Sequence, residues 1–405
     1  MGIHVIGGAY KEYCTWPSYT SLQGSAGRAA LCLTQIDSSL PITLHSRLAQ
    51  KDENELRALF FGNANVSLSL DNCDETVSFD YFHPLAEPKI LPSPINENLS
   101  GFTPNLPASA VAVVFGMIDA TPIVSASTVI YDPQNTYDPL LFSETGGIAE
   151  KLVYITNQNE IKIFGEKKGV SHTSVEDMAK WLHSTESAEV VIVKCGQRGA
   201  YVYSTNESGW ALPYETDSVS PVGSGDSFVA AYTYYWHILG CSALKAAEKA
   251  SVAAAHYVST GVMNNVQGLE VFQQSLTPVK ASKKKVYLAG PFFTLSELWM
   301  INEAKYYIES FGMETFSPFH EIGIGTADEV VQKDIDAIKD CDVMYAIFNG
   351  TDPGTLFEIG YAISLNKPVI ILAENPKAEE LKMYDGSGCK IFGDFSSSIY
   401  RLSWV

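Results

Sequence analysis

The 405-residue sequence is poor in positive charge. Lys and Arg number 27 against 46 Asp and Glu, which gives a formal net charge of -19. A protein that binds a nucleic-acid backbone needs surplus Lys and Arg, so we expect no nucleic-acid partner. A small anionic ligand held by local amides or by a single basic side chain remains compatible with this charge.

Cysteine is also scarce, and long apolar runs are missing. The seven cysteines form no CxxC pair, which argues against a disulfide framework or a zinc site and is typical of a reducing compartment. No apolar run is long enough to span a bilayer. The first residues, MGIHVIGGAYKEY, lack the basic start and apolar length of a signal peptide. These absences predict a cytoplasmic protein without a membrane partner.

The composition indicates a globular protein of two domains. Hydrophobic residues make up 46% and charged residues 18%, as in a packed protein, and 405 residues exceed one typical core. A polar stretch with Pro278 and the lysines 283–285 precedes the apolar run VYLAG, which reads as a linker followed by a new first strand. We therefore predict domains at 1–275 and 285–405, joined by a linker at 276–284.

Both parts alternate apolar strand-like runs with helical segments, which predicts parallel α/β layers. The first part contains IHVIGG, AVAVVFGMI, TVIYDPQ, KLVYITN and VVIVKCG, and a polar, Pro-rich section occupies about 68–107. The second part contains VYLAG, ETFSP, DVMYAIFN and PVIILAE. The predicted fold is an α/β sandwich followed by a smaller parallel-sheet domain of the flavodoxin or Rossmann type.

Two carboxylates mark the rim of the second predicted sheet. Asp352 and Glu358 lie between the strand DVMYAIFN and an apolar helix, and ligands of an open parallel sheet gather at the carboxyl ends of its strands. An ordinary alternative exists, because Thr355 and Glu358 fit the S/T-x-x-E capping box and Asp352 suits a helix N-terminus.

Three linked motifs in this part, VYLAGPFF, DIDAIKDCDVMYAIF and DPGTLFEIGYA, resemble the nucleoside 2-deoxyribosyltransferase family over nearly all of 285–375. The resemblance implies that Glu358 is the nucleophile and that no cofactor is needed. It implies that Asp352 and Asp334 donate a proton to the base or bind it, and that Tyr287 donates an orienting hydrogen bond. The substrate-binding residues it implies here are Gly290, Phe292 and Gly354.

Carboxylates suit the cleavage of an N-glycosidic bond. The anomeric carbon becomes oxocarbenium-like, and a carboxylate stabilises or captures it. A neighbouring carboxyl with a raised pKa protonates the leaving base, and crowding three acids raises one of their pKa values. Water or a second nucleobase then completes hydrolysis or transfer. The choice between deoxyribose and ribose, and between nucleoside and nucleotide, stays open.

A glycine-rich turn, SPVGSGDSFVAAY, stands out in the first part. Gly223, Ser224 and Gly225 precede a small-residue helix, where free amides and the helix dipole form an anion hole. Asp226 follows, placed to take a proton from a hydroxyl that attacks a phosphoryl group. The alternative is a plain turn before a helix capped by Asp226.

With its context, this turn resembles the G-A-G-D signature of the ribokinase, or PfkB, family across most of 1–275, which implies a ribokinase-like α/β/α fold and the use of ATP and Mg²⁺. The segment NQNE resembles the family's N-x-x-E element and implies that Asn157 and Glu160 organise phosphate and magnesium, Glu160 acting indirectly on the metal. The segment VVIVKCGQRGAYV implies that Lys194 and Gly196 flank the nucleotide.

The departures from this family fall on the substrate side. Glu12 lies where the family often has a sugar-binding Asp, and QGSAGR replaces G-G-x-x-x-N, so that Arg28 stands at the usual asparagine. An arginine facing the substrate pocket favours an anionic ligand. It is equally compatible with a pocket that no longer phosphorylates anything.

The sequence thus predicts a fused enzyme of nucleoside metabolism that forms a homo-oligomer. The second domain would cleave or exchange the base of a (deoxy)nucleoside or its monophosphate, and the first would phosphorylate a sugar or nucleoside. In the alternative, the first domain is a nucleotide sensor or scaffold that controls a nucleotide-depleting glycosidase in stress or phage defence.

Overall fold

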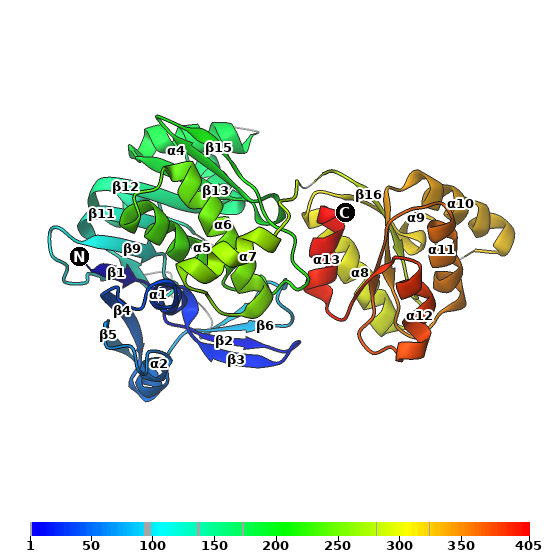
Figure 1. Ribbon diagram of the computed structural model, residues 1–405, viewed down its shortest axis with the longest axis horizontal. Coiled ribbons are helices and arrows are strands. Elements are labelled where there is room, and N and C mark those ends of the chain that lie inside the picture. Colours follow the sequence, from blue (N-terminus) through cyan, green and yellow to red (C-terminus); the bar gives the residue numbers. More distant parts are fainter. Residues whose placement is uncertain (1, 93–98, 136–137, 172–173, 281, 324) are drawn as a thin grey trace. The chain divides into compact units, whose positions relative to one another are not determined.

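The computed structural model describes residues 2–405 except 93–98, 136–137, 172–173, 281 and 324 (Figure 1). The chain forms two compact units. One contains Met1–Thr216 and Ser220–Pro278, and the other contains Asp217–Val219 and Val279–Val405.

A nine-stranded sheet in the order β15-β14-β13-β12-β11-β9-β1-β4-β5 is the centre of the first unit. Its strands are parallel except for β14 and β15, which pair antiparallel at one edge. All five predicted strand-like runs lie in this sheet. The strands are β1 (Ile3–Ile6), β4 (Ile42–Ala49), β5 (Val66–Cys73), β9 (Val111–Phe115), β11 (Ser125–Asp132), β12 (Ile148–Asn157), β13 (Val190–Lys194), β14 (Ala200–Ser204) and β15 (Ser208–Ala211).

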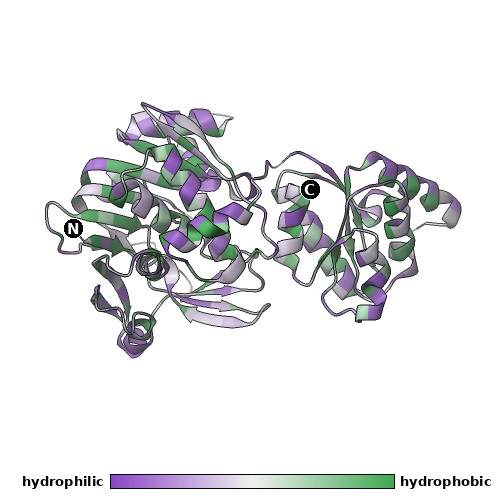
Figure 2. Ribbon diagram, viewed as in Figure 1, coloured by the Kyte–Doolittle hydropathy of each residue, from purple (hydrophilic) through white to green (hydrophobic). Residues whose placement is uncertain are grey.

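Helices cover both faces of this sheet, which is why its central strands are apolar on both sides. One core lies under α1 (Gly24–Ile36), α2 (Glu53–Leu59), α5 (Ser224–Thr233), α6 (Ala243–Thr260) and α7 (Val266–Ser275). The other lies under α3 (Gln158–Lys167) and α4 (Val175–Glu186). Figure 2 shows hydrophobic stretches along the strands between these layers. The α/β/α sandwich predicted from the sequence is confirmed.

A small sheet in the order β3-β2-β6-β7 lies beside the main sheet in the first unit. It consists of β2 (Lys11–Cys14), β3 (Tyr19–Leu22), β6 (Ser78–Tyr81) and β7 (Lys89–Leu91). A further pair joins β8 (Ser100–Phe102) to β10 (Ala120–Pro122). Strands β6 to β8 and most of β5 come from the section that the sequence marked only as polar and Pro-rich. Strand β5 alternates partly buried with exposed residues, so it carries no apolar run.

The second unit contains five parallel strands in the order β17-β16-β18-β19-β20. They are β16 (Lys285–Ala289), β17 (Glu314–Phe316), β18 (Val343–Ile347), β19 (Val369–Leu372) and β20 (Lys390–Phe392), and the sequence missed β20. Helices α10 (Ala327–Asp340), α11 (Pro353–Ser364) and α12 (Ala378–Gly386) pack on one face. Helices α8 (Leu295–Ser310) and α13 (Phe395–Trp404) pack together and contact the strands.

All seven cysteines carry free thiols, consistent with the expected absence of a disulfide framework. Within the described ranges, no helix combines the length and the apolar character needed to cross a membrane.

Candidate active sites

The second unit brings Tyr287 and Glu358 into direct contact. Tyr287 lies on the inner strand β16, and Glu358 lies on α11, the helix that follows the neighbouring strand β18. The Tyr287 hydroxyl donates a hydrogen bond of 2.7 Å to Glu358 Oε1. The tyrosine is fully buried, and its ring stacks on Phe316 at 5.7 Å between centroids. Packing therefore fixes the donor that holds Glu358.

Glu358 is a half-buried residue whose carboxyl has no cation beside it in the described chain. Its pKa is raised to about 8, chiefly by burial; the hydrogen bond from Tyr287 opposes this rise, and the charges of Asp334 and Asp352 add to it. In the described part of the chain, Glu358 forms no salt bridge. A pKa of about 8 means that this carboxyl is largely protonated at neutral pH. The predicted crowding of three acids is present, although burial is the larger cause.

Asp334 adds an unsatisfied acceptor to this site. It lies on α10, and its Oδ1 is buried with no hydrogen-bond partner among the residues that the structure describes. Burial raises its pKa, and the nearby Tyr287 hydroxyl opposes this shift. A buried acceptor without a donor is unfavourable, so this oxygen is suited to receive an N–H or O–H group from a ligand.

Asp352 is the N-cap of α11, as the helix-capping alternative in the sequence analysis predicted. Its Oδ2 accepts from the Thr355 backbone N–H at 2.7 Å and from the Thr355 hydroxyl at 2.9 Å. The capping box of Thr355 with Glu358 does not form, because the cap lies three residues earlier and Glu358 bonds to Tyr287. Glu358 is therefore free of capping, whereas Asp352 caps the helix and also lies close enough to shift the pKa of Glu358.

The other predicted substrate residues of this unit differ in their surroundings. A Cβ on Gly290 would lie 3.0 Å from Ile301 Cδ1, so packing explains that glycine. The ring of Phe292 contacts Phe293 at 4.9 Å and Phe319 at 5.3 Å. A Cβ on Gly354 would lie 3.1 Å from Asp352 Oδ2, which places this glycine beside the acidic group. Their substrate contacts remain predictions.

In the first unit, Arg28 is the centre of a buried charge cluster. Arg28, on α1, donates from Nη1 to Asp226 Oδ2 at 2.7 Å and from Nε to the Tyr257 hydroxyl at 2.9 Å. Its Nη2 donates to Glu12 on β2, and Glu12 also accepts from the Ser21 hydroxyl at 2.9 Å. Burial lowers the pKa of Arg28, but Glu12, Tyr257 and Asp226 outweigh burial and hold it above its usual value. The guanidinium is a permanent charge here.

The glycine turn accommodates this arginine. Gly223 has φ +83°, and a Cβ there would lie 2.3 Å from Arg28 Nε. Gly223 is also the N-cap of α5, so the predicted alternative of a helix capped by Asp226 is wrong. The Ser224 N–H donates to Pro221 O at 3.0 Å. One amide of the predicted anion hole is therefore already bonded within the turn.

A second charge cluster lies at the carboxyl ends of β11, β12 and β13. Lys194 ends β13 and forms a salt bridge with Asp132, the fully buried last residue of β11. Burial raises the pKa of Asp132, and the charge of Lys194 opposes this rise. The Oδ1 atom of Asp132 has no hydrogen-bond partner within the described chain. A Cβ on Gly225 would lie 3.3 Å from Lys194 Nζ. Lys194 thus lies next to the glycine turn, and its predicted place beside a nucleotide stays a prediction.

Glu160, the residue predicted to act on magnesium, is hydrogen-bonded at the start of its own helix, α3. Glu160 Oε2 accepts from the Thr156 hydroxyl and the Asn157 N–H, both at 2.9 Å, and Asn157 caps the same helix. Among the described residues, no group of three His, Cys, Asp or Glu side chains is placed to hold a metal ion. Gly196, at φ +54°, begins the turn after β13. The residues present give no direct magnesium site, so we derive no step through the metal.

Sequence reasoning missed three members of these clusters. Gln134 donates to Asp226 Oδ1, Tyr257 binds Arg28, and Asp132 binds Lys194. Asp132 had a signal, because it is a polar residue directly after the apolar run TVIY at a strand end. Tyr257 had none, since it is one aromatic in a small-residue helix.

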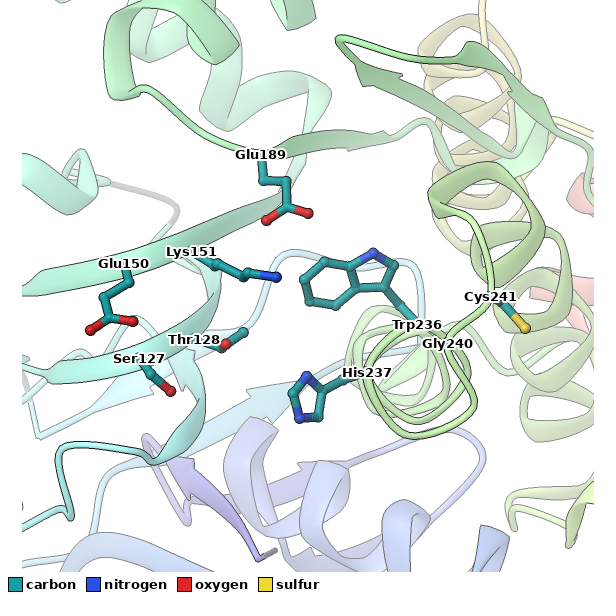
Figure 3. A pocket seen from close by; sticks show the side chains of 9 residues that line it. All are labelled: Ser127, Thr128, Glu150, Lys151, Glu189, Trp236, His237, Gly240 and Cys241. Carbon is teal, nitrogen blue, oxygen red and sulfur yellow. The ribbon is translucent and has the colours of Figure 1, made fainter.

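A cavity of about 520 Å³ lies at the opposite end of the main sheet (Figure 3). Residues early in β11 and β12 line it together with the turn after α5, including Thr128, Lys151 and Trp236. None of the predicted site residues lines this cavity.

Replacing Glu358 with glutamine is expected to make stability less sensitive to pH. A pKa raised from 4.5 to about 8 means that the folded state keeps a proton that the unfolded state loses between these values. Wild type therefore loses stability from about pH 4.5 to 8, and Glu358→Gln does not. We expect the variant to gain on the order of 2–4 kcal/mol over wild type at pH 8.5 and little at pH 4.5.

Urea unfolding at both pH values measures this difference. The matched control is Glu379→Gln, an exposed glutamate paired only with Lys382, which should track wild type at both pH values. An equal advantage of Glu358→Gln at pH 4.5 and 8.5 would contradict the raised pKa.

Replacing Arg28 with alanine is expected to destabilise the first unit strongly. The change leaves Glu12 and Asp226 buried without their cation, which costs about 3–5 kcal/mol. The exposed pair of Arg57 with Glu53 supplies the control, since Arg57→Ala should cost at most about 1 kcal/mol. Urea unfolding followed by circular dichroism distinguishes them, and equal midpoints for the two variants would refute the buried pairing.

Two family models match the chain, and the matches do not overlap. Residues 148–266 match the pfkB family carbohydrate kinase model. Residues 286–388 match the nucleoside 2-deoxyribosyltransferase model. Among curated proteins, an uncharacterized protein of Ureaplasma parvum is 30% identical over 106 aligned residues, which span 22% of this chain and 65% of that protein's length.

Solved structures are similar to the larger part of the chain. Ribokinase from Thermotoga maritima is 14% identical with a TM-score of 0.52, and the match covers 68% of this chain and all of that one. A ribokinase described as putative, from E. coli, is 18% identical with a TM-score of 0.50, covering 68% and 99%. At these identities the likeness shows the fold alone. As the two resemblances predicted, the chain joins a segment that matches the pfkB carbohydrate kinase family to one that matches the nucleoside 2-deoxyribosyltransferase family.

Proposed function

We propose that the second unit cleaves or transfers the N-glycosidic bond of a nucleoside or nucleoside monophosphate, with Glu358 as the nucleophile. One observation carries this proposal: Glu358 is held by Tyr287 beside two further acids, with burial raising its pKa to about 8. A structural carboxylate is typically paired with a cation, bonded to backbone amides as in Asp352, or exposed, whereas the hydrogen-bond donor to Glu358 is a tyrosine hydroxyl. The family match of residues 286–388 supports the same chemistry.

The reaction follows from the groups present. Ionised Glu358 attacks the anomeric carbon, the bond from that carbon to the base nitrogen breaks, and its electron pair leaves with the base. Asp352 or Asp334 supplies the proton that the departing nitrogen takes up. Water or a second nucleobase then attacks the anomeric carbon and gives its proton back to that aspartate, the bond from the carbon to Glu358 breaks, and Glu358 is released as a carboxylate.

The electrostatics favour the transition state over the empty site. A carboxylate in a buried site without a cation is unfavourable, as the raised pKa of Glu358 records. Positive charge that develops on the sugar at the transition state supplies the missing cation. Because this attraction is stronger in the transition state than in the ground state, it lowers the barrier.

Tyr287 and Asp334 have supporting roles in this proposal. Burial and the charge of Glu358 raise the pKa of Tyr287 far above its usual value, so the hydroxyl remains a donor and orients the nucleophile. Asp334 Oδ1, buried without a partner in the described chain, accepts a hydrogen bond from the base or the sugar.

For the first unit, two functions follow from the family match. Kinases of the pfkB family use ATP and typically Mg²⁺, and the sequence predicts phosphorylation of a sugar or nucleoside. The alternative is a non-catalytic nucleotide sensor or scaffold that controls the glycosidic site. The pairing of Arg28 with Asp226 favours the alternative.

Loss of Glu358 is expected to abolish release of the base. Chromatography of nucleosides and nucleoside monophosphates incubated with the protein should show free base with wild type. Glu358→Ala should be slower by about 10⁴-fold or more, as expected when a nucleophile is removed. The exposed control Glu379→Ala should match wild type. Equal rates for wild type and Glu358→Ala would exclude Glu358 as nucleophile.

The pH dependence of kcat/KM should report the ionisation of Glu358. Activity should rise with pH and reach half of its plateau near pH 8, because only the carboxylate attacks. The hydrogen bond from Tyr287 lowers the pKa of Glu358, so Tyr287→Phe should move the rising limb to higher pH. An unmoved limb with a reduced plateau would mean that the tyrosine does not act on Glu358.

A further inference from the structure

We propose that Arg28 occupies the place beside Asp226 that a phosphoryl acceptor needs, so that the first unit does not phosphorylate a sugar or nucleoside. Instead, the guanidinium acts as a built-in substitute for the acceptor and holds the small sheet (β3-β2-β6-β7) closed on the site.

Both oxygens of Asp226 are already occupied. Oδ2 accepts from Arg28 Nη1 at 2.7 Å, and Oδ1 accepts from the Gln134 side-chain amide. A general base must come within about 2.6–3.2 Å of the hydroxyl whose proton it takes. Each oxygen thus already accepts a hydrogen bond, and Arg28 Nη1 takes up an approach to Oδ2 that an acceptor hydroxyl would use.

Moving the arginine aside is unfavourable. Glu12 is 5% exposed and Asp226 is 4% exposed, so displacing Arg28 leaves two buried carboxylates facing each other without a cation. A neutral sugar or nucleoside brings no charge to replace it. A phosphorylated acceptor adds a third negative charge, because the charge of Arg28 is already matched by two acids. The expected preference of Arg28 for an anionic ligand is therefore not supported.

The same contacts tie separate elements together. Glu12 lies on β2 of the small sheet, whereas Arg28, Asp226 and Tyr257 lie on α1, α5 and α6. One guanidinium thus links the small sheet to three helices that pack on the main sheet (Figure 1). A bound acceptor would otherwise have to provide such a bridge.

This inference concerns the first unit and does not depend on the glycosidic site of the second. The phosphoryl-transfer test therefore uses the full chain carrying Glu358→Gln, which prevents cleavage of a nucleoside acceptor. The protein is incubated with γ-³²P-labelled ATP, Mg²⁺ and, in turn, ribose, 2-deoxyribose, adenosine and inosine.

We expect no labelled product and no acceptor-dependent rise in ADP above the rate without acceptor. Labelled sugar phosphate or nucleotide that disappears when Asp226→Asn is added would overturn the proposal, since Asp226 would then be a working base.

Hydrogen exchange tests the closing role of Arg28. In Arg28→Asn, which restores the residue of the resembled family, we expect amides of Lys11–Cys14 to exchange at least about 10-fold faster than in wild type, in keeping with local opening. Arg57→Ala should leave them unchanged. Unchanged exchange in Arg28→Asn would show that the guanidinium does not hold the small sheet. The phosphoryl-transfer test keeps Arg28, so it does not depend on the folding of Arg28→Asn.

Discussion

A carboxyl group buried at the edge of a parallel sheet needs either a cation or a proton, and both units are built around this constraint. The first unit supplies cations. Arg28 lies between Glu12 and Asp226, and Lys194 pairs with Asp132. The second unit supplies no cation to Glu358, so its carboxyl keeps a proton up to about pH 8.

The two solutions have opposite consequences for reactivity. A carboxylate paired with a guanidinium already has its charge balanced, so it gives little stabilisation to a positive charge that develops during a reaction. A carboxyl without a cation is unsatisfied when it ionises, and it responds strongly to positive charge on a bound substrate. The same residue type at the same edge of a sheet is thus suited to structure in one unit and to chemistry in the other.

Much of the fold could be predicted from the sequence, because both sheets contain strands buried on two faces. Runs such as VVIVK and DVMYAIF have no polar face and are recognisable alone. Strands β5 to β8 were not recognised, since half-exposed strands in a Pro-rich section have no apolar run. The predicted domain limits and the roles of the site residues stay predictions.

The local chemistry was harder to predict. Asp352 and Thr355 both fit a helix cap, and only the hydrogen bonds of Asp352 decide between them. The hydrogen-bond partners of Arg28 could not be predicted from the neighbouring residues in the sequence. Its partners at positions 12, 226 and 257 come from three other elements, and no local pattern reports that they meet.

The edges of the five-stranded sheet limit how copies of this chain can associate. Strands β17 and β20 have three residues each, too few to offer a long row of free backbone groups to a neighbouring strand. Large apolar side chains are instead exposed on helices, such as Leu295 on α8 and Phe357 on α11. The surface of this unit therefore favours helix-to-helix packing over the extension of one sheet into the next.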